Sequence, residues 1–365
     1  MKPSISSITR DELLSHFEKQ GESGYRADQV LRWVHQKYSV DWEGMSNLAK
    51  PLREKLSNQY TYSTVELACL QGQSGATRKF LWRLVDGQLV ESVLITASPA
   101  LYGETSDRHT LCVSTQVGCA YGCKFCASGL DGFKRDLQPA EIIDQVLGVE
   151  RWHRAQNGSD GRLINNLVIM GMGEPLANYD NLLAALEILN SNWGSSIGAR
   201  KITISTSGLV PEIDMLATQP RQYRLAISLH GATDEVRARI MPINRKYPLV
   251  ELIEAAKRYQ QKKNGMITLE YILISDVNDD LDQAKNLAKI ARQIHAKINL
   301  IPYNRVEGLK WKRPNEVAQE AFLAVVESEN VSVTLRREKG HDIDAACGQL
   351  RLRTQTEMAE SLKLS

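Results

Sequence analysis

Residues 118–126 read GCAYGCKFC and carry three cysteines, Cys119, Cys123 and Cys126, that stand four and then three positions apart. Thiolates this close in sequence converge on one inorganic centre. Structural zinc sites and electron-transfer iron–sulfur clusters usually take four protein ligands, and this stretch holds no fourth cysteine. Three ligands leave one iron open. The stretch therefore predicts a cluster that binds a substrate directly.

The spacing Cys-x3-Cys-x2-Cys resembles the signature of the radical S-adenosylmethionine (SAM) superfamily. The resemblance implies a 4Fe-4S cluster on Cys119, Cys123 and Cys126, with its open iron chelating the amino and carboxylate groups of SAM. Electron transfer to SAM then leaves a 5′-deoxyadenosyl radical. The residues alone also allow a zinc knuckle completed by His109 or His153, although zinc loops favour paired Cys-x2-Cys spacings.

The 365-residue chain is 42% hydrophobic, which is enough to bury a large core and predicts two or more domains. Its six cysteines make no disulfide framework, and their clustering favours metal or redox use in a reducing compartment. The first residues lack the apolar stretch of a signal peptide, and no run approaches the roughly 18 apolar residues of a membrane span. We therefore expect a cytoplasmic enzyme that does not engage a membrane.

Two small regions precede the main part of the chain. Residues 1–64 are predicted to form a helical accessory module, because Thr9 can cap a first helix and apolar residues repeat at helical spacing over 25–35. Residues 65–107 are predicted to form a β-hairpin extension and a linker. Alternating apolar residues over 80–85 and 90–95 flank Asp86-Gly87, which is a tight-turn signal.

From residue 108 onward, short apolar strands alternate with helices, which predicts parallel strands joined by right-handed crossovers. The six expected strands are Thr110–Ser114, Asn166–Met170, Lys201–Ser205, Arg224–Ser228, Thr268–Leu273 and Lys297–Ile301. Six are too few for a closed eight-stranded barrel, and the resemblance implies an open, partial (β/α)6 barrel over residues 108–335. A seventh strand, Val331–Leu335, is expected outside that core. The predicted class is α/β, with residues 336–365 as a C-terminal segment.

The chemistry of such barrels gathers on the loops that follow the strands. The second strand is followed by Gly171-Met172-Gly173-Glu174-Pro175, which resembles the superfamily's Gly-Gly-Glu-Pro motif. The resemblance implies that Gly173 and Glu174 hold the ammonium of SAM through backbone oxygens or a nearby carboxylate. Other strand ends offer groups that could bind a ribose, a carboxylate or an adenine, or could simply cap a turn or a helix. These candidates are Ser205, Ser228, Leu229, His230 and Asn304.

Two cysteines outside the cluster motif stand in informative contexts. Cys112 precedes Cys119 by seven positions, and Cys347 lies in Asp342-Ile343-Asp344-Ala345-Ala346-Cys347-Gly348-Gln349-Leu350. Both segments closely resemble the RlmN family of RNA adenine-C2 methyltransferases. The resemblance extends over nearly the whole chain and includes the pattern Arg26-x2-Gln29-x3-Trp33, Val90-Glu91-Ser92-Val93 and Ile301-Pro302-Tyr303-Asn304. Cys69 matches no motif, and we interpret it as a buried or incidental thiol.

The resemblance assigns a role to each matching position. Cys347 takes a methyl group from a first SAM, and a second SAM yields the radical that abstracts hydrogen from this methyl. The resulting methylene radical adds to C2 of adenine. Glu91 removes the C2 proton, and Cys112 attacks the sulfur of Cys347 to form a transient disulfide that frees the methylated base. Adenine C2 is electron-poor and cannot attack a sulfonium methyl, so a radical route is chemically reasonable.

The resemblance implies 23S rRNA as a partner, and also tRNA with adenosine 37 as the target. We further expect an electron donor such as flavodoxin, and a monomer as the default oligomeric state. The basic stretch Lys310-Trp311-Lys312-Arg313 combines charge with a stacking surface, and the N-terminal module adds Arg26, Arg32, Trp33 and Lys37. Two alternatives stay open. One is a Cfr-type enzyme that methylates adenine C8, and the other is a noncatalytic RNA-binding protein with a structural zinc or a redox-sensing cluster.

Overall fold

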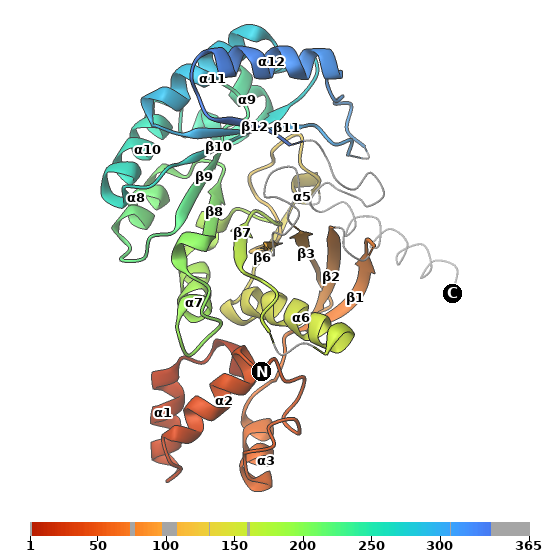
Figure 1. Cartoon of the computed structure of the whole chain (residues 1–365), viewed down its shortest axis with the longest axis vertical. Coiled ribbons are helices and arrows are strands. Elements are labelled where there is room, and N and C mark those ends of the chain that lie inside the picture. The colour runs from red at the N-terminus through yellow and green to blue at the C-terminus, as the bar shows by residue number, and fades with distance from the viewer. Residues whose placement is uncertain are drawn as a thin grey trace, which may run out of the picture.

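The structure is a computed structural model that describes residues 2–73, 77–96, 108–130, 132–158, 161–306 and 308–336. Cys347, with the C-terminal segment beyond Arg336, and the loop over 97–107 lie outside the described residues. Figure 1 shows a small helical module at the N-terminus below a large curved sheet with helices on its outer side. No helix in the described ranges is long and apolar enough to cross a membrane.

The N-terminal module consists of a short 3-10 turn, η1 (Ile5–Ser7), and three helices, α1 (Arg10–Lys19), α2 (Tyr25–His35) and α3 (Lys50–Gln59). Thr9 caps α1 as expected: its side chain accepts a hydrogen bond from the Glu12 N–H, and the Glu12 carboxylate accepts one from the Thr9 N–H at 2.8 Å. The pattern Arg26-x2-Gln29-x3-Trp33 is explained by a shared partner. Arg26 donates to Gln29 and to the carbonyl of Asn47, while the Trp33 indole donates to the Asn47 side chain.

A single sheet of ten strands forms the body of the molecule, in the order β1-β2-β3-β4-β7-β8-β9-β10-β11-β12. The first three strands and β4 pair antiparallel, and from β4 to β12 every neighbouring pair is parallel. The strands are β1 (Val65–Gln71), β2 (Arg78–Leu84), β3 (Leu89–Thr96), β4 (His109–Cys112), β7 (Asn166–Ile169), β8 (Ile202–Thr206), β9 (Arg224–Ser228), β10 (Thr268–Leu273), β11 (Lys297–Pro302) and β12 (Val333–Leu335).

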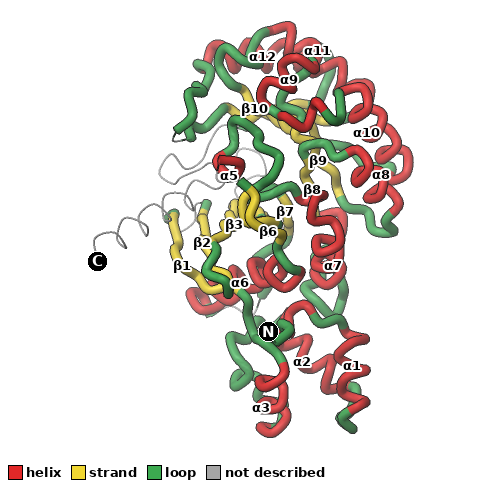
Figure 2. The backbone as a smooth tube through the Cα atoms, turned by 180° about the vertical axis from the view of Figure 1, so that it is seen from behind, coloured by secondary structure: helices red, strands yellow, loops and turns green. Residues whose placement is uncertain are grey.

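The predicted partial barrel with a hairpin extension is confirmed, and two details differ. The hairpin β2-β3 is continuous with the barrel sheet, because β3 pairs with β4. The seventh strand was expected outside the core, but β12 pairs parallel with β11 and extends the same sheet. Since β1 and β12 end the order, the sheet is open. Figure 2 shows its curvature from behind.

Helices follow most of the parallel strands, as the alternating pattern predicts. They are α6 (Pro139–Asn157), α7 (Tyr179–Asn190), α8 (Val210–Thr218), α9 (Asp234–Ile240), α10 (Leu249–Lys263), α11 (Leu281–Gln293) and α12 (Glu316–Ser328), with the 3-10 turns η2 (Pro175–Asn178), η3 (Ala199–Lys201) and η4 (Pro242–Arg245). Helix α6 covers the outer face of the first strands. There, Phe80 meets Trp152 with ring centroids 5.2 Å apart, and Gly148 leaves room for the ring of Trp82.

A second, two-stranded sheet brackets the cysteine stretch. It pairs β5 (Gln116–Gly118) with β6 (Phe133–Asp136), and the four-residue helix α5 (Ala127–Leu130) lies between them. Gly118 has φ of +76°, and a Cβ there would lie 1.8 Å from the carbonyl oxygen of Gly132. Only glycine fits this crossing, so the backbone itself sets where the cysteine loop begins.

Candidate active site at the carboxyl ends of the strands

The cysteine loop runs from Cys119 to Cys126, past the carboxyl end of β4, and is held by its main chain. The N–H of Lys124 donates to the carbonyl of Ile240 at the end of α9 (2.9 Å), and the carbonyl of Lys124 accepts from the Trp311 indole (2.9 Å). Trp311 was expected to offer a stacking surface for RNA. It is half-buried, and its indole N–H braces the cysteine loop.

The three thiols influence one another electrostatically. Burial, together with the charges of Cys126 and Glu174, raises the pKa of Cys119 to about 11. Burial also raises the pKa of Cys123, with additional contributions from Cys126 and Cys119. Thiolates that destabilise one another need a shared positive centre. Three such thiols in one glycine-containing loop fit an iron–sulfur cluster.

The geometry of the zinc alternative is unfavourable. Among the residues that the structure describes, no three His, Cys, Asp or Glu side chains come close enough to bind one metal ion. His109 begins β4, at the opposite end of the strand from the cysteine loop, and lies near His153 on α6; burial and then the charge of His109 lower the pKa of His153.

Glu174 follows β7 and is buried with 3% of its surface exposed. Its carboxylate accepts hydrogen bonds from the N–H of Ser207 at 2.7 Å and the N–H of Leu176 at 3.1 Å. Burial raises its pKa. The carboxylate is therefore occupied in joining the end of β7 to the end of β8, which leaves the neighbouring carbonyl oxygens as the better acceptors for an ammonium group.

Gly173 lets this loop lie against the start of β5, which leads into the cysteine loop. Its φ is +98°, and a Cβ there would lie 2.5 Å from the Cβ of Gln116. The N–H of Thr115 and the N–H of Gln116 both donate to the carbonyl of Met172, at 2.9 and 3.2 Å. These two main-chain hydrogen bonds fix the Gly-Met-Gly-Glu-Pro loop against the segment that leads into the cysteine loop.

The ends of β8 and β9 bring two predicted hydroxyls together. Ser205 and Ser228 lie on these adjacent strands with their Oγ atoms 3.4 Å apart. Ser205 is largely buried, and Ser228 is partly exposed. Two hydroxyls side by side at the open end of parallel strands can bond a diol or a carboxylate.

His230 follows β9 in the left-handed region, with φ of +56°. Its Nδ1 accepts a hydrogen bond from the N–H of Ile272 at 3.1 Å, and Phe125 of the cysteine loop meets its ring edge-on, with centroids 4.8 Å apart. Burial and the charge of Arg237 lower its pKa to about 3. The ring is neutral with Nδ1 as acceptor, so Nε2 carries the proton and can donate it to a ligand.

Arg237 on α9 is a site residue that the sequence analysis missed. Its side chain is fully buried and donates to the carbonyl oxygens of Leu229 (3.1 Å), Ser228 (3.4 Å) and Ser207, and to the Asn244 side chain (2.8 Å). Burial lowers its pKa to about 10, while the charge of Cys123 opposes that shift. Within a helix of alternating charged residues nothing local distinguishes this arginine from a surface one.

Cys112 and Glu91 come together on the first strands of the sheet. Cys112 ends β4 and is 6% exposed, and its register partner on β3 is Val93. Glu91 is 3% exposed and lies two positions from Val93, so alternation puts its side chain on the same face as Cys112. Cys347, the partner expected for Cys112, lies outside the described residues.

Asn304 follows β11 and is half-buried. The N–H of the preceding Tyr303 donates to the carbonyl of Leu273, and burial, with a smaller contribution from the charge of Cys126, raises the pKa of the Tyr303 phenol. The end of β11 thus lies near the cysteine loop. The predicted SAM contacts come from four strand ends on the same side of the sheet.

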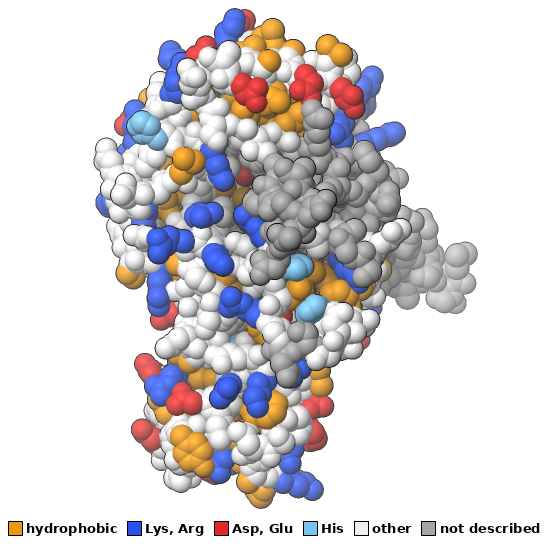
Figure 3. Space-filling view, in the orientation of Figure 1, with side chains coloured by type: hydrophobic (Ala, Val, Ile, Leu, Met, Phe, Trp, Pro, Cys, Tyr) orange, Lys and Arg blue, Asp and Glu red, His pale blue; other side chains and the backbone are white. Residues whose placement is uncertain are grey.

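Basic side chains are spread from the N-terminal module over the neighbouring part of the barrel, as Figure 3 shows. Of the expected RNA contacts, Arg32, Lys310, Lys312 and Arg313 are exposed. Trp33 is half-buried and covered by the Lys37 ammonium, 3.8 Å from the ring centroid. The module docks on the barrel through Gln36, which donates to the carbonyls of Asn192 and Gly194.

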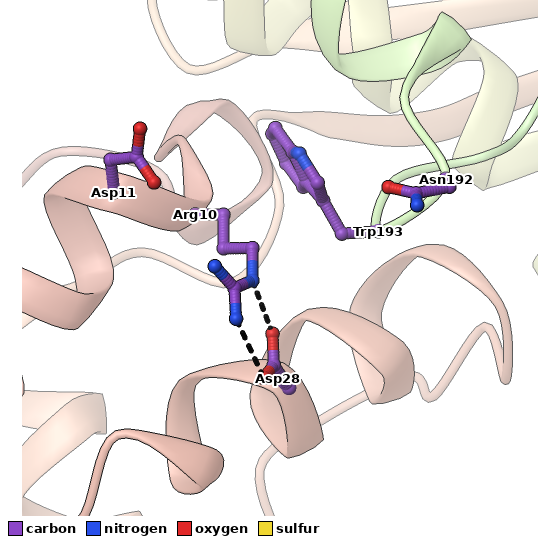
Figure 4. A pocket seen from close by; sticks show the side chains of 5 residues that line it. All are labelled: Arg10, Asp11, Asp28, Asn192 and Trp193. Atoms are coloured by element: carbon purple, nitrogen blue, oxygen red, sulfur yellow. Dashed lines mark hydrogen bonds and ion pairs between the residues drawn. The ribbon is translucent and has the colours of Figure 1, made fainter.

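A surface hollow of about 510 Å³ lies at this docking site and is lined by Arg10, Asp11, Asp28, Asn192 and Trp193. Figure 4 shows the Arg10 guanidinium paired with the Asp28 carboxylate, with the Trp193 ring beside Arg10; the two hydrogen bonds of this pair are 2.6 and 3.1 Å long. None of the cysteines or strand-end residues lines it. The hollow belongs to the junction of the two domains and is separate from the cysteine loop.

Two family models match this chain. The Ribosomal RNA large subunit methyltransferase N-terminal domain matches residues 4–61, and the Radical SAM superfamily matches residues 113–288. A probable dual-specificity RNA methyltransferase RlmN of Akkermansia muciniphila is 53% identical over 355 residues, covering 97% of each chain. The chain belongs to the RlmN family. A second relative, probable dual-specificity RNA methyltransferase RlmN 3 of Opitutus terrae, is 52% identical over 359 residues, covering 98% of this chain and 96% of the relative.

A solved structure agrees with this membership. The crystal structure of a radical SAM methyltransferase from Sphaerobacter thermophilus matches with a TM-score of 0.88 at 39% identity, and the match covers 95% of this chain and 98% of that one. The helical module, the hairpin and the partial barrel are therefore arranged in this RlmN-family chain much as they are in a known methyltransferase. The predicted family and fold class are confirmed.

Proposed function

We propose that this chain is a radical SAM methyltransferase that methylates C2 of a specific adenine in 23S rRNA and adenine 37 of tRNAs. One observation carries the proposal: Cys112 is a buried thiol on the strand that leads into the cysteine loop, yet it lies outside the Cys-x3-Cys-x2-Cys set. The match of the N-terminal module to an rRNA methyltransferase domain supports rRNA as substrate. The name of the relatives, dual-specificity RNA methyltransferase, supports a second RNA.

Cys119, Cys123 and Cys126 would hold a 4Fe-4S cluster, which when bound supplies the electron that cleaves SAM. The chain's own residues orient SAM. Carbonyl oxygens beside Gly173 take its ammonium, and the paired hydroxyls of Ser205 and Ser228 suit its ribose or carboxylate. The Nε2–H of His230 and the amide of Asn304 supply further hydrogen bonds, and Leu229 presents its main chain at the same strand end. Two SAM molecules are used per turnover.

A methyl carrier is needed because adenine C2 is an electron-poor carbon with no lone pair. The thiolate of Cys347 can displace the methyl group of a first SAM, forming an S–CH3 bond as S-adenosylhomocysteine leaves. Hydrogen abstraction from this S-methylcysteine gives a carbon radical, which can add to C2. Glu91 then takes the C2 proton, and the remaining electron passes to the oxidised form of the flavodoxin-type electron carrier, which leaves a closed-shell thioether.

The base is at this point tethered to Cys347 through a thioether. The thiolate of Cys112 attacks the sulfur of Cys347, so that an S–S bond forms and the S–CH2 bond breaks. The electron pair goes to the methylene carbon, which takes a proton and becomes the methyl group. A thiol reductant restores both cysteines, while an electron donor such as flavodoxin serves the SAM cleavage. We place this activity in the cytoplasm and on a monomer.

The substitution Cys112→Ala tests the proposal, because it removes the thiol that releases the base. In anaerobic reactions of reconstituted protein with SAM, reductant and an rRNA transcript, we expect this variant to stay covalently attached to RNA. Cys69→Ala is the matched control, since Cys69 is a cysteine of the same sheet, on β1, that also lies outside the cluster set, and it should release methylated RNA normally. Free and unmodified RNA in the Cys112→Ala reaction would contradict the role of Cys112.

The position of the methyl group is tested separately. Mass spectrometry of nucleosides from rRNA and tRNA transcripts should show 2-methyladenosine, whereas 8-methyladenosine would favour the Cfr-type reaction. A noncatalytic RNA-binding protein would form no 5′-deoxyadenosine in the same reactions.

A further inference from the structure

A buried ammonium group lies beside the proposed base. The Nζ of Lys79 on β2 is 3.4 Å from Oε2 of Glu91 on β3, and the two side chains are 1% and 3% exposed. No motif in the sequence singles out Lys79. A lysine this deeply buried is rare unless its charge has a partner and a use.

The strand register puts Lys79 on the face that carries the chemistry. Lys79 pairs with Val93 across β2 and β3, and Val93 pairs with Cys112 across β3 and β4. Directly paired residues of antiparallel strands point to the same side, and Glu91 lies two positions from Val93 on that side. The ammonium, the carboxylate and the thiol therefore share one patch of the sheet.

The opposite face of β2 and β3 packs against helix α6. Phe80 lies against Trp152 of α6, and Ser92 joins the Trp82 indole (3.1 Å) to the Gln145 side chain (2.9 Å). The Arg78 guanidinium over the Trp152 ring and the Asp86–Arg135–Glu141 bridge add charged contacts between the hairpin and α6, and none of these contacts involves Lys79 or Glu91. The ion pair of Lys79 and Glu91 is not needed to dock the hairpin.

The stability of the folded chain is a weak reason for keeping a buried pair of charges such as Lys79 and Glu91. Removing two charges from water costs about as much as their attraction returns, and apolar side chains of similar size serve a core as well or better. A buried carboxylate that must accept a proton has a different need. It requires a nearby positive charge, which offsets the free-energy cost of burying the negative carboxylate and fixes the direction of the carboxylate oxygens.

We propose that Lys79 is a positioning residue for the Glu91 carboxylate in the RNA methylation reaction. Its ammonium compensates the buried negative charge and holds one carboxylate oxygen, so that the other oxygen can face the C2–H of the bound adenine. The inference rests on the proposed function, since it takes Glu91 as the group that receives the C2 proton. Lys79 itself touches neither SAM nor the base.

The test uses the full chain with its cluster reconstituted and follows 5′-deoxyadenosine and 2-methyladenosine in the same anaerobic reactions. For Lys79→Met we expect SAM cleavage within about twofold of the unmodified chain and methylated RNA reduced at least tenfold. Lys79→Arg should restore part of the methylation, because it keeps a cation at this position. Arg83→Met is the matched control, since Arg83 lies on the same strand and face but pairs with exposed Glu66 at 3.9 Å, and it should behave like the unmodified chain.

A double variant separates positioning from folding. Lys79→Met combined with Glu91→Gln removes both charges of this pair, and we expect it to lose no more methylation than Glu91→Gln alone, because both act through one carboxylate. Additive losses in the double variant would overturn the inference, as would a parallel fall of 5′-deoxyadenosine and 2-methyladenosine in Lys79→Met. If the unmodified chain formed no 2-methyladenosine, the proposed function would fail and this inference with it. Parallel losses against an active unmodified chain would overturn only the role of Lys79.

Discussion

Substitution of Gly173 by alanine should damage the proposed SAM site far more than a glycine substitution in an ordinary turn. Gly173 has φ of +98°, which lies beyond the left-handed region that other residues tolerate, and this conformation alone costs an alanine about 2 kcal/mol. The added Cβ would lie 2.5 Å from the Cβ and 2.9 Å from the backbone nitrogen of Gln116. Neither atom is the end of a flexible side chain, so overpacking adds about 1–3 kcal/mol.

The total loss expected for Gly173→Ala is about 3–5 kcal/mol, reduced by about 0.5–1 kcal/mol because alanine also restricts the unfolded chain. The loop can relieve the overlap only by moving away from Gln116, which breaks the bonds from Thr115 and Gln116 to the Met172 carbonyl. That movement shifts the carbonyls proposed to take the SAM ammonium. We therefore expect SAM to bind at least tenfold more weakly, which equals about 1.4 kcal/mol.

Gly87→Ala is the matched control. Gly87 has φ of +81° in the turn between β2 and β3, and a Cβ there would meet no atom within 4 Å. Its loss should be confined to the conformational cost, about 1–2 kcal/mol, with SAM affinity unchanged. Urea unfolding measures both stability losses, and equilibrium dialysis of the reconstituted chain measures SAM binding. Equal losses in the two variants, or unaltered SAM binding by Gly173→Ala, would refute the steric argument.

Three further predictions concern buried groups around the site and the domain junction. Burial lowers the pKa of His35 to about 3 from its ordinary 6.5, so the unfolded chain binds this proton at a higher pH than the folded chain does, and the free energy of unfolding falls as the pH falls. His35→Leu should reduce the slope of that decline between pH 6.5 and pH 3 by up to about 1.4 kcal/mol per pH unit. An unchanged slope, measured by urea unfolding at several pH values, would contradict this. Arg237→Lys should lower the free energy of unfolding by about 2–4 kcal/mol, because a lysine cannot donate to all the oxygens that the guanidinium contacts. A midpoint of urea unfolding equal to that of the unmodified chain would refute this prediction. Trp311→Phe keeps an aromatic ring but removes the indole N–H, and with it the hydrogen bond to the Lys124 carbonyl, which contributes about 1 kcal/mol. Without this bond the reconstituted chain should lose iron to a chelator faster. An unchanged rate of iron loss would show that the bond does not hold the cysteine loop.

The parts that the sequence predicted correctly are those written in local patterns. The cap at Thr9, the turn at Asp86-Gly87 and the alternation of strands and helices each depend on residues a few positions apart. The strand ends that carry Glu174 and His230 were predictable for the same reason, because parallel strands joined by right-handed crossovers place their carboxyl ends on one side. The use of each side chain was not predictable. The Glu174 carboxylate accepts hydrogen bonds from the N–H groups of Leu176 and Ser207, and only the fold brings the Ser207 N–H near it.

Trp311 and Lys79 show the limit most clearly. In sequence Trp311 is an aromatic residue within a basic run, as an RNA contact would be, yet it lies against the carbonyl of Lys124, which is 187 positions away. Lys79 is one of many lysines until the register of β2 and β3 places it beside Glu91.

The sequence by itself determined the three-cysteine loop, the order of strands and helices and the separation of Cys112 from the cluster set, because spacing and hydrophobic period are properties of neighbours along the chain. Only the tertiary structure decided that Arg237 joins the ends of β8 and β9 and that Lys79, Glu91 and Cys112 share one face. The reason is physical: a buried charge is tolerated only where distant strands converge to compensate it, and that convergence depends on strand register and packing, which no local pattern records.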